Sequence, residues 1–529
     1  MQCDATINIE SEKMDKLDRE FFEYLYAQGD ALAEIPQQEK ERIEEWLELS
    51  RTSLKLTVPM VELFKALKDA KDQYGVSPDK IGLDRGELEL LAMKHQNIDE
   101  HNVSIGGRVM ISREIVKSAD ARVEEYLKVR KEIAPTGTEL WDQMLENKRK
   151  IMKALNMSDK DWDSYGGQIK HAITSVEQLA SILDVPQKLI EDIQRVSKVF
   201  RMRISPYYAS LIIPGQVNDP VLLQSVPTGD MVDNKGIELE PVASDHSPAR
   251  LIDQFYPRVL TIKATNMCAM FCTHCLRIAH ISDKDWVSSK NTYEEALDYI
   301  RKNKNIRDVL ITGGDALALS NKRIKYLLDE LDKIDHLETK RLGSRIPIMT
   351  PQRVNQEFLD ICEESNDKKP LRFVTQINSV QEITPVAKEA FRKLNKVTSA
   401  VLNQAVFLRG INDNKYKMWR LSEELQNAHI RPYYLFNCSF RNPEFAHMRV
   451  PVEIGRDIVE SMYGNISGDA IPRYLATAGG KIPLHRENVI GRDGNDIILK
   501  KPWSGEEARY PDMSMEEYAQ PFSFEKYQE

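Results

Sequence analysis

Between residues 258 and 437 short apolar runs alternate with amphipathic runs, and this alternation constrains the fold more than any other feature. The apolar runs predict strands, and the runs with apolar residues three or four apart predict helices. Strands joined by helices form parallel sheets with right-handed crossovers. Six such strands predict an α/β fold, a partial (βα)6 barrel with its functional loops at the carboxyl ends of the strands. The expected strands are 258–265, 308–312, 340–346, 371–377, 398–408 and 431–437. The expected helices are 293–303, 321–334, 354–364, 384–395 and 414–428.

Three of the six cysteines directly follow the first of these strands, as Cys268, Cys272 and Cys275. Three thiolates on one loop can hold three irons of a cubic [4Fe–4S] cluster and leave the fourth iron open to a small molecule. A structural zinc site usually takes four ligands in two separated pairs, and only His274 lies nearby. A two-cluster ferredoxin needs more cysteines, and six in 529 residues do not form a disulfide framework. The spacing therefore indicates an open cluster and resembles the signature of radical S-adenosylmethionine enzymes.

Composition narrows the remaining classes of function. The net charge of −9 gives no overall basic character that would favour binding to nucleic acid. No apolar run approaches the roughly 20 residues of a membrane span. The N-terminus lacks the basic and apolar regions of a signal peptide. With sparse cysteine and an oxygen-sensitive cluster motif, we expect a cytoplasmic protein without nucleic-acid or membrane partners.

Further motifs carry polar groups suited to small ligands. Gly313-Gly314-Asp315 follows the second strand, and paired glycines let the backbone approach a ligand closely, although a plain tight turn has the same form. Lys481 follows two glycines and can form a Schiff base with an aldehyde if its pKa is lowered, or it is an ordinary loop lysine. Arg258 and Arg277 flank the cysteine loop and can bind phosphate or carboxylate, or pair on the surface.

By pattern the chain divides into four segments. Residues 1–155 form a charged, helical N-terminal extension in which no histidine, cysteine or carboxylate cluster has ligand spacing. Residues 156–257 form a lead and linker, whose proline- and glycine-rich part at 214–250 is expected to be a connection rather than an element. Residues 258–440 form the partial barrel. Residues 441–529 form a C-terminal cofactor-binding segment with the lysine loop and a tail.

Together these motifs resemble the lysine 2,3-aminomutase family, radical enzymes that use S-adenosylmethionine and pyridoxal 5′-phosphate. The resemblance runs from about Trp162 to Arg492, and the first 150 or so residues have no counterpart in compact members. Besides the cysteine loop and Gly313-Gly314-Asp315, the matching motifs in order are Ile204-Ser205-Pro206-Tyr207-Tyr208, Asn218-Asp219-Pro220, Tyr256-Pro257-Arg258-Val259-Leu260, Pro351-Gln352-Arg353, Asn403-Gln404-Ala405, Gly410-Ile411-Asn412-Asp413, Arg431-Pro432-Tyr433-Tyr434, Ser467-Gly468 and Gly479-Gly480-Lys481.

The resemblance implies a role for each of these sites. The cluster ligands are Cys268, Cys272 and Cys275. The residues around S-adenosylmethionine are His274, Gly313, Gly314 and Asp315. Arg258 matches a ligand of the pyridoxal phosphate, on a strand one residue longer than in the family, and Lys481 matches the lysine that binds its aldehyde. Arg277 matches the arginine that binds the substrate α-carboxylate.

Several positions depart from the family pattern. Lysine-specific members hold the distant ammonium with two aspartates, and the corresponding residues here are Ser439 and Thr477. Burying a lysine ammonium without a carboxylate is costly, so we expect a polar or acidic substrate such as glutamate. Arg473 is a candidate for binding such a side chain, or it pairs on the surface. Gln376 replaces a family histidine, and Asn414 replaces a cysteine that helps bind an intersubunit zinc, so that zinc is not expected.

The resemblance implies an isomerase. One electron cleaves S-adenosylmethionine, the resulting radical takes a hydrogen from the substrate β-carbon, and the α-amino group moves there while pyridoxal phosphate holds it. We expect a 2,3-aminomutase of a free amino acid other than lysine, a homo-oligomer reduced by a donor such as flavodoxin or ferredoxin. The alternatives are a radical enzyme with a different outcome, acting on a peptide or protein docked by the N-terminal helices, and a non-catalytic protein that kept the fold.

Overall fold

The computed structural model describes residues 105–234, 247–281, 284–438, 440, 442–522 and 527. The chain divides into two compact units, Met1–Glu125 and Tyr126–Glu529, and every strand described below belongs to the second. Among the described residues, no helix is both long enough and apolar enough to cross a membrane.

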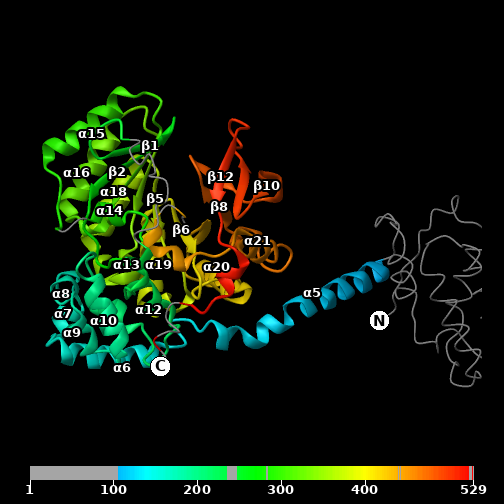
Figure 1. Ribbon diagram of the computed structural model, residues 1–529. Helices are drawn as coiled ribbons and strands as arrows, with labels where there is room; N and C mark the ends of the chain where they lie inside the picture. The colour runs from blue at the N-terminus through cyan, green and yellow to red at the C-terminus, as the bar shows by residue number, and fades with distance from the viewer. Residues whose placement is uncertain are drawn as a thin grey trace, which may run out of the picture. The chain divides into compact units, whose positions relative to one another are not determined.

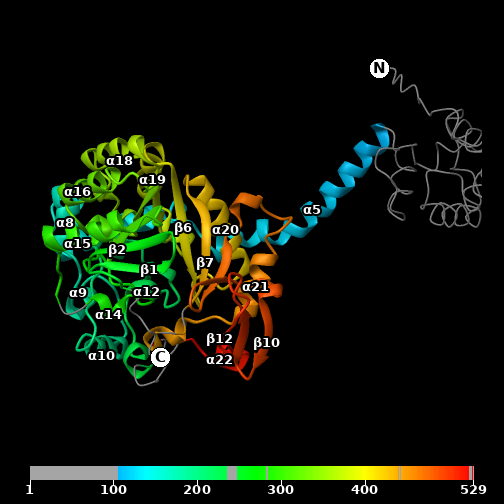
Figure 2. The same cartoon turned by 90° about the horizontal axis from the view of Figure 1, so that it is seen from above.

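A nine-stranded sheet, whose strands neighbour one another in chain order, forms the centre of the second unit. The six predicted strands are confirmed, all parallel, as β2 (Val259–Thr265), β3 (Asp308–Gly313), β4 (Thr339–Gly343), β5 (Leu371–Thr375), β6 (Ala400–Phe407) and β7 (Arg431–Asn437). Three further strands were not predicted. They are the antiparallel edge strand β1 (Ile252–Tyr256), the parallel strand β8 (Arg473–Thr477) and the antiparallel strand β9 (Lys481–Pro483). The sheet curls into a half-barrel (Figure 2).

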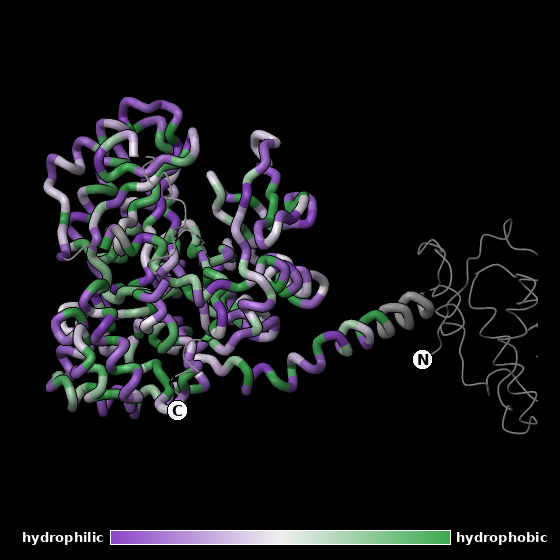
Figure 3. Tube along the Cα trace, viewed as in Figure 1, coloured by the Kyte–Doolittle hydropathy of each residue, from purple (hydrophilic) through white to green (hydrophobic). Residues whose placement is uncertain are grey.

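Amphipathic helices connect the parallel strands, as the sequence pattern predicted. They are α15 (Lys290–Lys302), α16 (Asn321–Asp332), α18 (Gln356–Lys368), α19 (Pro385–Val397) and α20 (Lys415–Asn427). Helix α19 illustrates the features that made these helices predictable. Thr384 caps its N-terminus, Pro385 occupies the first turn, and one stripe of residues is buried. That stripe consists of Ala387, Ala390, Phe391 and Leu394. Figure 2 shows α16, α18 and α19 side by side along the sheet, and Figure 3 shows apolar and polar stretches alternating along the helices.

Residues ahead of the half-barrel are mostly helical. Helices α5 (Ile105–Ile133) and α6 (Trp141–Ala154) lie in the predicted helical extension, whose residues 1–104 are outside the described residues. In α6, Asn147 Nδ2 donates to the carbonyls of Ser210 and Ile212, at 3.0 and 2.8 Å, so this helix packs into the second unit. The shorter helices that follow are α7 (Asp159–Trp162), α8 (Tyr165–Lys170), α9 (Val176–Ala180), α10 (Gln187–Val196) and α11 (Pro206–Ser210).

The prediction of a plain connection at 214–250 is wrong in its first half. Helices α12 (Pro220–Ser225) and α13 (Asp230–Asp233) form there. Asp219 caps α12 by accepting the N–H groups of Val221 and Leu222, both at 2.8 Å, and Pro220 stands in the first turn, where no N–H is needed. A proline in this setting starts a helix instead of breaking one.

The remaining elements are short. Helices α14 (Ile278–Ile281) and α17 (Ile346–Met349) follow β2 and β4, and α21 (Val452–Glu460) and α22 (Met515–Ala519) lie near the C-terminus. Strand β4 ends three residues before the predicted 346, because Pro347 belongs to the first turn of α17. A second, antiparallel sheet consists of β10 (Val489–Asp493), β11 (Asp496–Lys500) and β12 (Glu507–Pro511) (Figure 1).

Candidate functional site

Hydrogen bonds join the three loops that follow β2, β3 and β4. The loop after β2 carries the three cysteines, and its carbonyls at Thr265 and Met267 accept the N–H groups of Gly314 and Asp315, at 2.5 and 2.8 Å. The Asp315 carboxylate in turn accepts the N–H of Arg345, in the loop after β4, at 2.7 Å. Because the carboxyl ends of parallel strands meet at one edge, the cysteine loop and the Gly-Gly-Asp turn form one site there.

Only glycine fits at the turn after β3. Gly313 has φ +127°, and a Cβ there would lie 2.2 Å from the Thr265 carbonyl oxygen. A Cβ on Gly314 would lie 2.5 Å from the Met267 carbonyl oxygen. The glycines therefore let the turn lie directly against the backbone of the cysteine loop.

The three thiols of this loop fit a cluster of several irons. Cys268, Cys272 and Cys275 are half-buried and free. Burial raises the pKa of Cys275 to about 12, and the neighbouring Cys272 adds to the shift. Burial, Asp315 and the other two cysteines raise the pKa of Cys268. Thiolates this close together require positive charge between them. Within the described ranges no three His, Cys, Asp or Glu side chains converge on a single ion. A cubic cluster needs no such convergence, because it spreads its thiolate ligands over different irons.

His274, within the triplet, is buried and neutral, because burial and the charge of Arg345 hold its pKa well below the usual value. Its Nε2 lies 3.3 Å from the Asn378 amide nitrogen and 3.4 Å from that of Gln376. If Nε2 accepts from these amides, the proton is on Nδ1. That buried Nδ1 has no hydrogen-bond partner in the described part of the chain, so it is available to an acceptor on a ligand.

Lys481 lies at the start of β9, among aromatic rings. Its Nζ is 4.7 Å from the centre of the Tyr434 ring, 5.8 Å from that of Tyr256 and 5.9 Å from that of Phe436. Burial lowers the pKa of Lys481 to about 8, and the positive charge of Arg341 contributes. An appreciable share of the side chain is therefore an uncharged amine near neutral pH, the form that attacks an aldehyde.

A cluster of charged side chains near Lys481, around Asp308, was not predicted from the sequence. The buried Asp308 carboxylate accepts from Arg341 Nε at 2.8 Å and from Arg372 Nη2 at 2.6 Å. Two guanidinium groups on one carboxylate leave a net positive charge at the amino ends of β3, β4 and β5. The sequence could have indicated this cluster, because charged residues within otherwise apolar strands must find buried partners or a ligand.

The other predicted site residues are placed as follows. Arg258, at the amino end of β2, is 61% exposed and pairs with Glu338 at 3.5 Å, so the structure does not place it against Lys481. Arg277 Nη1 donates to the Gly313 carbonyl at 3.0 Å, beside the cysteine loop. Arg473 lies 5.9 Å from the centre of the Tyr433 ring, and Thr477 is exposed on β8. Ser439 lies outside the described residues.

The contact between the turn and the cysteine loop leads to a testable prediction. We expect Gly314→Ala to lose most of the iron that the protein takes up in anaerobic reconstitution, because the added Cβ displaces the loop at Met267. Overpacking of this kind costs about 1–3 kcal/mol. Gly166→Ala is the matched control, since a Cβ there meets nothing within 4 Å, and it should keep full iron and melting temperature. A Gly314→Ala protein with wild-type iron content would contradict this account.

Comparison with known proteins identifies clear relatives. The chain is 37% identical to glutamate 2,3-aminomutase of Clostridioides difficile over 406 residues, which cover 76% of the chain and 95% of that protein. It is 36% identical to L-lysine 2,3-aminomutase of Methanococcus maripaludis over 367 residues, 68% of the chain and 83% of the relative. For L-lysine 2,3-aminomutase of Clostridium subterminale the identity is 33% over 362 residues, 68% of the chain and 86% of the relative. No protein-family profile matches the chain.

Proposed function

Because this chain belongs to the lysine 2,3-aminomutase family of radical S-adenosylmethionine enzymes, we propose that it moves the α-amino group of a polar or acidic amino acid other than lysine, such as glutamate, to the β-carbon. Family membership makes the protein an isomerase whose substrate is a small molecule, an amino acid. One observation carries the choice of substrate class: the similarity to a glutamate 2,3-aminomutase spans 95% of that protein.

The proposed cofactors are a [4Fe–4S] cluster, S-adenosylmethionine and pyridoxal 5′-phosphate, with a flavodoxin- or ferredoxin-type electron donor. When bound, they supply the radical and hold the migrating amine. Cys268, Cys272 and Cys275 would bind the cluster, and their mutual repulsion as thiolates supports this. His274, with its unpartnered Nδ1, and the Gly313-Gly314-Asp315 turn would bind S-adenosylmethionine.

Lys481 would bind the aldehyde of pyridoxal phosphate. Its lowered pKa would supply the uncharged amine, and the nearby rings of Tyr256 and Tyr434 would shield that amine from water. Arg258 remains a proposed phosphate ligand and would have to leave Glu338 to bind it. Arg341 adds positive charge near Lys481 and is a further candidate. Arg277 would bind the substrate α-carboxylate beside the cysteine loop.

Strands β8 and β9 support an acidic or polar substrate. Thr477 is the register partner of Lys481, and Arg473 is the register partner of Tyr434. Register partners, and residues at even spacing along a strand, point to the same face of a sheet. Arg473 and Thr477 therefore share the face of Lys481. The Arg473 guanidinium would attract a carboxylate on the substrate side chain and repel an ammonium, and Thr477 contributes no negative charge.

The test is an anaerobic assay of the reconstituted protein with S-adenosylmethionine, pyridoxal phosphate, dithionite and one amino acid at a time. Mass spectrometry of the derivatised products should show 3-aminopentanedioate from glutamate and little or no β-lysine. Arg473→Gln should raise KM for glutamate about ten- to hundredfold, because a charge-assisted hydrogen bond contributes about 1.5–3 kcal/mol. Arg486→Gln, an exposed arginine paired with Glu460, is the control and should change nothing. Faster turnover of lysine than of glutamate would exclude the proposed substrate class.

A further inference from the structure

Arg345 joins a cysteine of the loop after β2 to a buried carboxylate. It lies two residues after the end of β4, and its side chain is only 6% exposed. One amino group, Nη1, donates to Cys272 Sγ at 3.0 Å. The other, Nη2, donates to Glu382 Oε1 at 2.7 Å and to Gln224 Oε1 at 2.6 Å. The guanidinium is thus fixed between a sulfur atom and its counter-ion.

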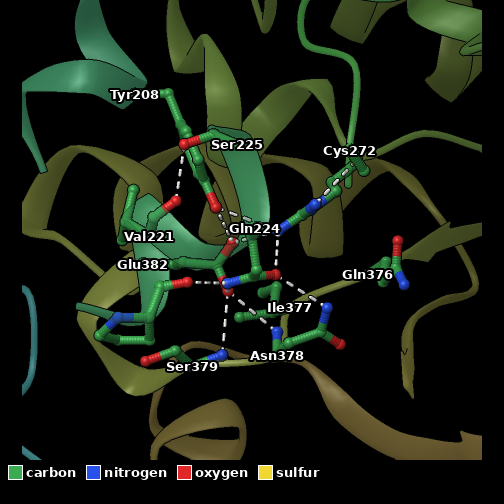
Figure 4. Close-up of polar contacts among 12 residues, drawn as sticks. Tyr208, Val221, Gln224, Ser225, Cys272, Gln376, Ile377, Asn378, Ser379 and Glu382 are labelled. Atoms are coloured by element: carbon green, nitrogen blue, oxygen red, sulfur yellow. Dashed lines mark hydrogen bonds and ion pairs between the residues drawn. The ribbon is translucent and has the colours of Figure 1, made fainter. Parts of the chain in front are cut away.

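Glu382 is held equally firmly. Its carboxylate is fully buried and accepts the N–H groups of Asn378 and Ser379, both at 2.9 Å, and the Tyr208 hydroxyl at 2.9 Å. Asn378 Nδ2 also donates to Gln224 Oε1, at 2.9 Å. Figure 4 shows Tyr208, Gln224, Asn378 and Glu382 gathered in this network, with Cys272 at its edge. Because so many contacts fix both partners, the charges cannot reorient when the sulfur changes its charge.

Of the two charges in the Arg345–Glu382 ion pair, only that of Arg345 contacts the sulfur of Cys272. A buried ion pair contributes little net stability, because desolvating both charges offsets their attraction. Here the guanidinium contacts the sulfur, whereas the carboxylate binds the far side of the network. Cys272 therefore lies next to a fixed positive charge and an N–H donor. Hydrogen bonds to sulfur and the nearby charge are the features that set the potential of an iron–sulfur cluster.

We propose that Arg345 is a positioning residue that, through Cys272, raises the reduction potential of the cluster, and that Glu382 limits the rise. This inference rests on the proposed function, in which Cys268, Cys272 and Cys275 hold the cluster. Reduction adds one electron from an external low-potential donor and moves no atoms. The added negative charge is stabilised by the guanidinium and destabilised by the carboxylate.

The test is a redox titration of the reconstituted full-length protein, with dithionite and mediator dyes, followed by the electron paramagnetic resonance signal of the reduced cluster. Arg345→Gln combined with Glu382→Gln should make reduction about tenfold less favourable, about 59 mV lower for one electron. Glu382→Gln alone should shift the potential in the opposite direction, upward. A structural role of the network would not produce shifts of opposite sign.

Arg420→Gln combined with Glu139→Gln is the matched control. Arg420 Nη2 donates to both Glu139 oxygens at 2.7 Å, and the Arg420 side chain is only 6% exposed. Among the described residues, neither side chain forms a hydrogen bond or ion pair with any of the three cysteines, so the loss of this ion pair should leave the potential unchanged. Iron and sulfide analysis distinguishes a failure of the proposed function from a failure of the role proposed for Arg345. A wild type that takes up no cluster refutes the proposed function. If the cluster is complete but its potential is unchanged in both the double variant and Glu382→Gln, this inference alone is refuted. If the double variant does not fold, Glu382→Gln decides, because an unchanged or lower potential contradicts the proposal.

Discussion

Lys481→Ala is expected to lose both the visible absorbance of bound pyridoxal phosphate and all aminomutase activity. No other side chain described here combines a lowered amine pKa, a position against three aromatic rings and a place on the face shared with Arg473. In the proposed role of Lys481 only the unprotonated amine would attack the aldehyde. The rate of pyridoxal phosphate binding should therefore rise with pH and level off above about 8, the lowered pKa of Lys481.

Lys501→Ala is the matched control for this experiment. Lys501 Nζ pairs with Glu506 at 3.0 Å, and its side chain comes close to Gly479 in the lysine loop. Absorbance spectra recorded with stoichiometric pyridoxal phosphate should show the bound cofactor in Lys501→Ala and only the free cofactor in Lys481→Ala. Both variants should still cleave S-adenosylmethionine when no amino acid is turned over. Retained absorbance in Lys481→Ala would mean that another amine binds the aldehyde.

The barrel strands and crossover helices could be predicted because each carries its own periodicity. In a strand such as Val259–Thr265 half-buried and buried residues alternate, and a helix such as α19 has a buried stripe with a capping threonine ahead of it. Strands β8 and β9 were missed for the same reason. Strand β9 has only three residues, too few to show a period, and β8 is not followed by an amphipathic run of the kind that marks the predicted strands; β8 pairs with the edge of β7, and β9 pairs with β8. The division of the chain into four segments remains a prediction.

The cysteine triplet and the glycine turn could be recognised because all their chemistry lies within a few consecutive residues. The Arg345 network could not, because its partners come from segments far apart in the chain. Arg345 and Glu382 are 37 residues apart, and Arg345 and Cys272 are 73 residues apart. A signal was nevertheless present. Arg345 comes shortly after a barrel strand, as the cysteines and Gly313-Gly314-Asp315 do, and an arginine at that edge points to the site.

Cys272→Ser is expected to retain the fold of the protein but not to take up the proposed [4Fe–4S] cluster. The side chain is only half-buried and forms no disulfide, and a serine hydroxyl can also accept the hydrogen bond of Arg345, so the substitution should change the melting temperature of the iron-free protein little. A serine hydroxyl does not ionise near neutral pH and is a poor ligand for the soft iron of a cluster. The two remaining thiolates would leave two irons without a protein ligand. Iron content, the visible absorbance of the cluster and cleavage of S-adenosylmethionine should therefore all fall to background.

Cys362→Ala separates this effect from the general loss of a buried thiol. Cys362 is fully buried in α18, and burial raises its pKa to about 12, so it behaves as an apolar side chain. Its removal should lower the melting temperature through lost packing and leave iron content and S-adenosylmethionine cleavage intact. The two variants thus have opposite signatures: one loses the cluster and keeps its stability, and the other keeps the cluster and loses stability. A Cys272→Ser protein that binds the full complement of iron would show that a different set of ligands holds the cluster. The role assigned to Arg345 would then fail with it, because that role acts through the sulfur of Cys272.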